Sequence, residues 1–267
     1  MKETHVTRRG RKIRLADLDP DDDAGLGNKD KASARLAKDL ERLRRLQLML
    51  YADDRFAVLV VLQAMDTAGK DGTIRHVMSG LNPVGCVVTS FKVPSSEEQH
   101  HEYLWRIHKA VPPRGVIGVF NRSHYEEVLV ARVHKLVPKE LWRLRYKQIN
   151  DFERMLHENG VEIIKFFLHI SKAEQARRLQ ARIKDPTKNW KFQPGDVAER
   201  RHWKAYQAAF EDAINKCTTP WAPWHIVPAN KKWARDCIVA RAMADRLESL
   251  KLRYPKPITD LSKVVIR

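Results

Sequence analysis

A loop that combines glycine, lysine and aspartate follows the first apolar stretch of the chain. The segment Gln63–Thr73 reads QAMDTAGKDGT; it comes directly after the apolar run Phe56–Leu62 and precedes a plausible helix. Phosphate oxygens need many donors and positive charge, and backbone N–H groups, a helix N-terminus and a lysine supply both. The segment therefore indicates a phosphate-binding loop, with Lys70 and the surrounding amides facing a phosphoryl group.

The loop departs from the usual phosphate-loop pattern in two places and carries one unusual carboxylate. Ala64 stands where the first glycine is expected, and Asp71 replaces the Ser or Thr that would hold magnesium. Asp66 lies inside the loop, where a carboxylate would repel bound phosphates unless a cation lay between them. Asp66 is therefore a candidate magnesium ligand.

The net charge of +17 indicates an anionic partner, which could be nucleic acid, an acidic membrane surface or a phosphate-rich molecule or polymer. Between Ser171 and Lys204 there are ten Lys or Arg residues against four acids. A solvated basic face would explain this segment. Because the loop at Lys70 indicates a phosphate site, a mobile cationic lid at about 171–204 explains these charges better.

Alternating strand and helix patterns favour a three-layer α/β/α fold with a parallel sheet. We expect a flexible N-terminal arm over 1–30 and a single domain over 31–267. The strand candidates are Phe56–Leu62, Gly85–Phe91, Gly115–Phe120, Val161–Ile170 and His225–Val227. The helix candidates are Lys31–Asp53, Thr73–Ser79, Ser96–Ala110, Lys139–Glu158, Lys172–Lys184, Asp196–Lys216 and Lys232–Leu252.

Ligands of such sheets bind beyond the carboxyl ends of the strands, and three of these ends carry polar residues. The first end carries Asp66 and Lys70, the second carries Lys92, and the third carries Asn121 and Arg122. The guanidinium of Arg122 is a planar fork of donors that suits a phosphoryl group. Asn121 stands where phosphate-loop enzymes usually place a magnesium-orienting aspartate, so it would bind a cation weakly.

Several ordered motifs resemble the polyphosphate kinase 2 family over roughly residues 30–255. They are Ala64–Ile74, Asn82-Pro83, Ser90–Pro94, Phe120–His134, Lys184–Phe192 and Ala222–Trp233. The run Asn121–Glu127, NRSHYEE, is similar to the class III branch, which is associated with phosphorylating both AMP and ADP. The resemblance implies a kinase-like fold with a helical lid. It also implies reversible phosphoryl transfer from inorganic polyphosphate to AMP and ADP, giving ADP and ATP, with magnesium or manganese.

The resemblance and the loop together give each candidate residue a role. Catalysis is assigned to Asp66, which would bind the metal, and to Lys70, Arg122 and Arg178, the last descending from the lid. Phosphate binding is assigned to Thr67, Ala68, Gly69, Lys70, Asp71, Gly72, Thr73, Arg75, Lys92, Arg122, Arg132, Arg178, Lys184 and Lys191. Asn121, Glu126 and Glu127 would lie by the nucleotide, and either glutamate could instead hold a second metal ion.

Two other functions stay open on the sequence. One is an ATP-dependent nucleoside or nucleotide kinase, which shares the core and a basic lid. The other is a nucleic-acid-binding protein, but no helix-turn-helix, zinc spacing or aromatic RNA signature supports it, so we expect no specific nucleic-acid partner. Without a signal peptide or a run of ~20 apolar residues, we expect a cytoplasmic protein with no membrane partner and reduced cysteines. The terminal helices could supply a homo-oligomer interface.

Overall fold

A six-stranded sheet forms the centre of the computed structural model, which describes residues 5–264 and 266. The strands lie in the order β1-β6-β5-β2-β4-β3. Their bounds are β1 His5–Val6, β2 Ala57–Ala64, β3 Cys86–Ser90, β4 Ile117–Asn121, β5 Val161–His169 and β6 Trp224–Pro228. Strands β2 to β6 are parallel, and β1 joins β6 antiparallel at one edge. The expected parallel α/β sheet is confirmed.

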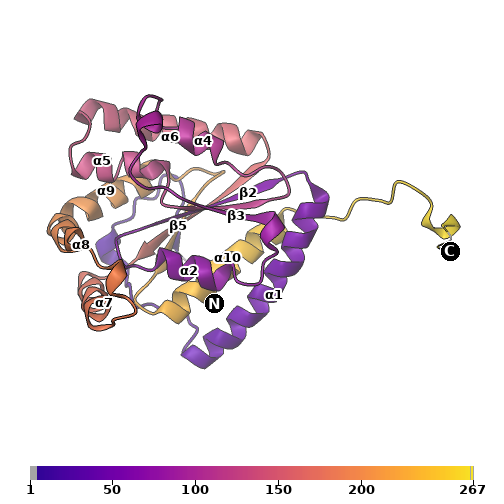
Figure 1. The fold of residues 1–267 in the computed structure, drawn as a ribbon, viewed down its shortest axis with the longest axis horizontal. Helices are drawn as coiled ribbons and strands as arrows, with labels where there is room; N and C mark the ends of the chain where they lie inside the picture. Colours follow the sequence, from indigo (N-terminus) through magenta and orange to yellow (C-terminus); the bar gives the residue numbers. More distant parts are fainter. Residues whose placement is uncertain (1–4, 265, 267) are drawn as a thin grey trace.

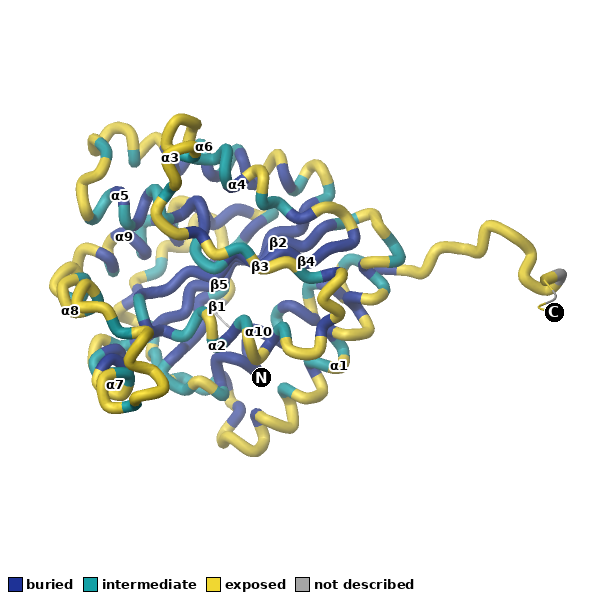
Figure 2. The backbone as a smooth tube through the Cα atoms, in the orientation of Figure 1, coloured by how far each residue is buried: buried dark blue, intermediate teal, exposed yellow. Residues whose placement is uncertain are grey.

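The two central strands are buried along their whole length, as the dark tubes in Figure 2 show. Their runs of Val, Ile, Leu and Phe suit strands that are covered on both faces. The register pairs Leu62 of β2 with Asn121 of β4, so the two strands end side by side. The segments that follow β2 and β4 therefore emerge at the same edge of the sheet.

Helices cover both faces of the sheet (Figure 1). Helices α1, α2 and α10 form one layer, in which α10 packs against both α1 and α2. Helices α4, α5, α6 and α9 lie on the other face. The bounds are α1 Lys29–Asp53, α2 Lys70–Val77, α3 Ser96–Gln99, α4 Trp105–Lys109, α5 Val130–Val133, α6 Lys139–Glu158, α7 Lys172–Lys184, α8 Pro194–Glu199, α9 Trp203–Lys216 and α10 Lys232–Ser249.

Two expected helices are interrupted in the structure. The stretch 96–110 forms α3 and α4 with a break between them, although the capping box of Ser95 and Glu98 is present as expected. In the break, the Glu102 carboxylate accepts from the backbone N–H of Leu104, and the His101 ring stacks on Trp105 at 3.9 Å. The stretch 196–216 divides into α8 and α9 around a 3-10 turn at Arg200–His202.

The N-terminal segment differs from the flexible arm expected over 1–30, because its described residues pack on the body. Thr7 donates to the Trp224 carbonyl and contacts the Thr218 hydroxyl at 2.6 Å. Leu15 is buried in the core, and Asn28 caps α1 by accepting from the Lys31 N–H. The contacts of Thr7 and Leu15 could not be predicted from the local sequence, since their hydrogen-bond partners are about 200 positions away.

The C-terminal segment after α10 leaves the body as an extended arm (Figures 1 and 2). Shortly after α10, Arg253 donates its backbone N–H to the Asp53 carboxylate at the end of α1. Beyond it, Ile258, Leu261 and Val264 are exposed. Within residues 5–264 and 266, no helix has the length and apolar character that crossing a bilayer requires.

Candidate active site

A basic cleft of about 380 Å³ opens beyond the carboxyl ends of β2 and β4. Its lining includes ten cationic side chains against three carboxylates. The cations are Lys70, Arg75, Arg122, Arg177, Arg178, Arg182, Lys188, Lys191, Lys232 and Arg235, and the acids are Asp66, Asp71 and Asp196. Such a charge balance in one hollow favours a ligand that carries several negative charges.

The loop between β2 and α2 forms the floor of this cleft. Helix α2 begins at Lys70, and its N-cap Gly69 has φ +108°, a conformation that glycine adopts without strain. A Cβ at Gly69 would lie 1.9 Å from a terminal nitrogen of Arg235. Residue 69 must therefore be glycine both for its backbone conformation and for the close approach of the Arg235 guanidinium.

Lys70 lies half-buried in the cleft, with its Nζ donating to the Ala64 carbonyl at 3.1 Å. Burial lowers the pKa of Lys70 and the charge of Arg122 adds to this effect, whereas Asp66 and Glu126 oppose it. Among the described residues, the ammonium thus donates to one backbone carbonyl, while Arg122 repels it and Asp66 and Glu126 attract it. A bound phosphate would add an anionic hydrogen-bond partner.

Arg122 links the two neighbouring strand ends. Its guanidinium donates to Asp66 at 3.1 Å and to Glu126 at 3.4 Å. Although burial alone would lower the pKa of Arg122, these two carboxylates outweigh it and raise the pKa above its ordinary value. The backbone of Arg122 has φ +65°, in the left-handed region that non-glycine residues rarely occupy. Such strain is common where a side chain must be aimed at a site.

Asp66 provides a fitting oxygen donor for the divalent ion that the sequence predicts at this site. Its carboxylate is one-third exposed and lines the cleft. The described part of the chain contains no group of three or more His, Cys, Asp or Glu residues that could form a complete metal cage. Magnesium tolerates this arrangement because it is often held by one or two carboxylates together with substrate phosphates and water.

Asn121 lines the cleft and connects the loop to β3, and its side-chain oxygen is buried without a hydrogen-bond partner in the described part of the chain. Its side-chain NH₂ donates to Asp71 at 2.9 Å and to the Ser90 hydroxyl at 3.3 Å. Asp71, which replaces the usual Ser or Thr, is therefore held by a neutral amide. Two of the departures noticed in the sequence, Asp71 and Asn121, thus form one hydrogen-bonded pair.

The two glutamates that follow Arg122 point to different places. Glu126 lies close to Arg122 and Lys70, and burial raises its pKa even though these two cations lower it. Glu127 instead accepts from Arg145 at 2.5 Å and lines a second hollow of about 590 Å³ beside Tyr103 and Leu104. Only Glu126 belongs to the immediate surroundings of Arg122.

Of the cationic side chains assigned to phosphate binding, three do not line the cleft. Lys92 lines a separate hollow of about 320 Å³ beyond β3, and Lys184 is exposed at the end of α7. Arg132 donates to Asp212 at 2.7 Å and to the Tyr146 hydroxyl at 3.2 Å, and it lies over the Trp142 ring. Side-chain direction, which motif spacing does not reveal, separates these three from Arg75 and Lys191, which do line the cleft.

Arg178 differs most from its expected role. Instead of extending from the lid into the open cleft, its guanidinium donates to the carbonyls of Thr67, Ala68, Ala229 and Asn230 and to Glu174. Only 7% of it is exposed. Arg178 therefore ties the phosphate loop to the end of β6, and it borders the cleft without a donor directed at open solvent.

Arg178→Ala should lower the free energy of unfolding by about 3–5 kcal/mol, because four buried carbonyls and Glu174 would lose their donor. Chemical denaturation measures this change. Arg177→Ala is the matched control, since Arg177 pairs with the same Glu174 but is exposed and should contribute less than ~1 kcal/mol. Equal losses in the two variants would contradict the structural role of Arg178.

Several residues that line the cleft are not among the site residues predicted from the sequence. Arg235 of α10 is 1% exposed, donates to the Ala68 carbonyl and is held by Asp236. Lys232, at the start of α10, lines the cleft beside it, as do Arg177, Arg182 and Lys188. The sequence contained a signal for Lys232, because Lys231 and Lys232 follow β6 and a fourth strand end therefore also carries cations.

Fold and cleft together define a P-loop kinase-like phosphotransferase. The family model for polyphosphate kinase 2 matches residues 27–255, so this chain belongs to the polyphosphate kinase 2 family. It is a polyphosphate-dependent nucleotide phosphotransferase, as the names of its relatives below support.

Relatives and solved structures agree with this family. The chain is 50% identical over 267 residues, all of both chains, to the AMP/ADP-polyphosphate phosphotransferase of Meiothermus ruber. It is 49% identical to the ADP-polyphosphate phosphotransferase of Rhodopseudomonas palustris, over 83% of this chain and 81% of the relative. The crystal structure of polyphosphate kinase 2 from Arthrobacter aurescens superposes with a TM-score of 0.92 at 42% identity, over 98% of this chain and 97% of the other.

Proposed function

We propose that this protein transfers the terminal phosphoryl group of inorganic polyphosphate to AMP and to ADP, giving ADP and ATP, in a reversible reaction. The observation that carries the proposal is the cleft with ten cationic side chains around the phosphate loop, Asp66 and Arg122. Acceptance of both nucleotides is supported by the NRSHYEE motif and by the name of the Meiothermus ruber relative.

The cleft suits a polymeric donor. Polyphosphate carries about one charge per phosphate and would be held as a nucleic-acid backbone is held, by cations without base readout. Arg75, Arg177, Arg182 and Lys191 line the walls, and they would bind phosphates beyond the reacting one. The basic segment 171–204, which contributes three of these side chains, would act as the lid.

Phosphoryl transfer needs alignment and charge neutralisation more than covalent chemistry. The loop amides at the start of α2 and the Lys70 ammonium would hold the transferring phosphoryl group. Arg122 would bridge the donor and acceptor phosphates from the neighbouring strand end. A magnesium ion, when bound, supplies charge neutralisation between phosphate oxygens, and Asp66 would be its protein ligand.

The acceptor nucleotide would approach from the side of β4. We place Asn121, Glu126 and Glu127 there, with Glu126 next to Arg122 and Glu127 facing the hollow beside Tyr103. The exposed apolar side chains of the C-terminal arm favour contact with another copy of the chain, which supports a homo-oligomer.

The test is nucleotide synthesis from AMP and, separately, from ADP, with long-chain polyphosphate and magnesium. We expect ADP and ATP from AMP and ATP from ADP, with no product when polyphosphate is omitted. ATP from ADP alone would remove AMP from the proposal. No product with either acceptor, but transfer to nucleosides or nucleotides from ATP, would replace it by an ATP-dependent kinase.

A further inference from the structure

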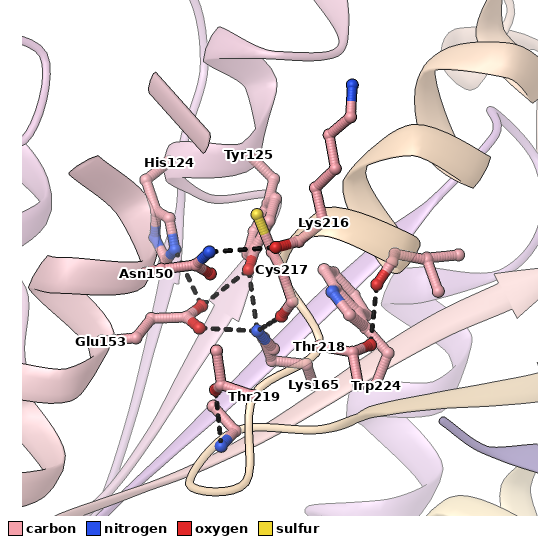
Figure 3. Close-up of polar contacts among 12 residues, drawn as sticks. His124, Tyr125, Asn150, Glu153, Lys165, Lys216, Cys217, Thr218, Thr219 and Trp224 are labelled. Carbon is pink, nitrogen blue, oxygen red and sulfur yellow. Dashed lines mark hydrogen bonds and ion pairs between the residues drawn. The ribbon is translucent and has the colours of Figure 1, made fainter. Parts of the chain in front are cut away.

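A fully buried charged network lies between β5 and α6, next to segment 122–126 (Figure 3). Lys165 of β5 has 0% exposure, and its Nζ contacts Glu153 Oε2 at 2.6 Å, the Tyr125 hydroxyl at 2.8 Å and the Cys217 carbonyl at 2.7 Å. An ammonium has three N–H donors, so these three contacts satisfy it completely. None of these residues lines the cleft.

Glu153 of α6 contacts three members of the network through its carboxylate. Besides Lys165, its carboxylate accepts from the Tyr125 hydroxyl at 2.8 Å and lies 3.3 Å from His124 Nε2. Burial alone would raise the pKa of Glu153, but Lys165 and His124 outweigh it and hold the pKa below its ordinary value. Burial and Glu153 raise the pKa of Tyr125, which therefore remains a hydroxyl donor.

The network ends on the residues between Arg122 and Glu126. His124 and Tyr125 directly precede Glu126 in the chain, and Arg122 adopts the strained left-handed conformation two residues before His124. On the other side, Ser123 Oγ accepts from Gln63 Nε2 of β2 and from the backbone N–H of Tyr125. A strained residue persists only when its surroundings over-determine it, and these contacts fix the segment from both sides.

Stability alone does not account for a buried ion pair in this place. Taking two charges out of water costs about as much as their attraction returns, and apolar residues of similar volume often stabilise a core as well or better. What such a network supplies is a fixed orientation for the groups it binds. Here those groups belong to the segment that carries Arg122, which lines the cleft, and Glu126, which accepts a hydrogen bond from Arg122.

We propose that Tyr125, Glu153 and Lys165 are positioning residues for phosphoryl transfer, acting through Arg122. They hold segment 122–126 so that the Arg122 guanidinium lies between Asp66 and Glu126 before substrate binds. The inference rests on the proposed function, because it assigns Arg122 to the transferring phosphates.

The first experiment is Tyr125→Phe, which keeps the ring and removes only the hydroxyl. We expect kcat with polyphosphate and ADP to fall ~10–100-fold, since a misplacement of about 1 Å can cost 10²-fold, while KM for polyphosphate changes less than about threefold. Glu162→Gln is the control: like Glu153, Glu162 is a buried carboxylate paired with a cation, and it lies on β5, but its partner Arg246 does not line the cleft. It should keep the wild-type kcat. A wild-type kcat in Tyr125→Phe, or an equal loss in Glu162→Gln, would overturn the inference.

The second experiment asks whether the effect passes through Arg122. In an Arg122→Ala background, adding Tyr125→Phe should lower kcat less than about twofold further, because the group that the network positions is already gone. If the two losses instead multiply, the network does not act through Arg122 and the inference fails.

A second variant covers the case in which Tyr125→Phe does not fold. The double change Glu153→Gln with Lys165→Met removes both charges together, so no buried charge is left unpaired. It should fold, as judged by thermal unfolding, and show the same loss in kcat; a folded double variant with wild-type kcat would contradict the proposal. Absence of polyphosphate-driven transfer in the wild type would refute the proposed function itself, which separates the two failures.

Discussion

Lys70→Ala should lower the turnover number by ~10²–10³-fold, the loss seen when one charge-stabilising donor is removed from a transition state. Lys70 begins α2, lies half-buried in the cleft and, within residues 5–264, has only the Ala64 carbonyl as a hydrogen-bond partner, at 3.1 Å. Its side chain contributes little to holding the loop, which Arg178 and Arg235 already tie down through backbone carbonyls. The folded state should therefore survive. Initial rates of ATP formation from ADP and polyphosphate measure the effect.

Lys184→Ala is the matched control for this prediction. It removes the same charge from an exposed position on α7 that does not line the cleft. Its turnover should stay within about threefold of the wild type, because exposed charges are screened by salt. If the two variants lost turnover equally, general charge attraction and not a placed ammonium would account for the role of Lys70.

Asp66→Asn should reduce turnover still further, by ~10³-fold or more, because a metal ion contributes several kcal/mol of charge stabilisation. The two side chains have nearly the same shape, and the loop backbone is held by other residues, so thermal unfolding should change little. The expected signature is a loss that extra magnesium does not fully restore. Turnover measured across a magnesium titration, in wild type and variant, supplies the test.

Asp71→Asn distinguishes a metal ligand from a general need for carboxylate in the loop. Asp71 is exposed and already paired with the Asn121 amide. We expect a loss below ~10-fold, since exposed partners contribute modestly. Equal losses in the Asp66 and Asp71 variants would show that the metal role is shared or that it is not located at Asp66.

Much of the fold could be predicted because its signals are local. The apolar runs of β2 and β5 and the bounds of α6 and α7 follow from residue type, periodicity and caps, and the structure confirms them. The breaks within 96–110 and 196–216 could not be predicted, because side-chain contacts interrupt segments of favourable helix composition. Strand β1 is only two residues long, and its pairing with β6 depends on contacts from the far end of the chain.

In the candidate site, too, the residues placed by local signals could be predicted and those placed by packing could not. Lys70, Asp66 and Arg122 could be placed together from sequence, since the ends of neighbouring parallel strands must meet at one edge. The direction of a long side chain on a helix is decided by packing, so Arg132 and Arg178 could not be placed correctly. Arg235 was missed for a related reason: it approaches the loop from α10, a helix remote in the chain, and only the absence of a Cβ at Gly69 leaves room for it.

The position of the C-terminal arm has a practical consequence for attaching this protein to a surface. Helix α10 runs back from the strand ends that form the cleft, so the arm beyond Ser249 departs at the opposite end of the molecule (Figure 1). A bead that captures the chain by this arm would hold the cleft outward, where a long polymer can enter without meeting the support. Capture through the N-terminal segment would instead pull on β1 and on the contacts of Thr7 with Thr218 and Trp224. The segment after α10 is thus the better point of attachment for an immobilised catalyst.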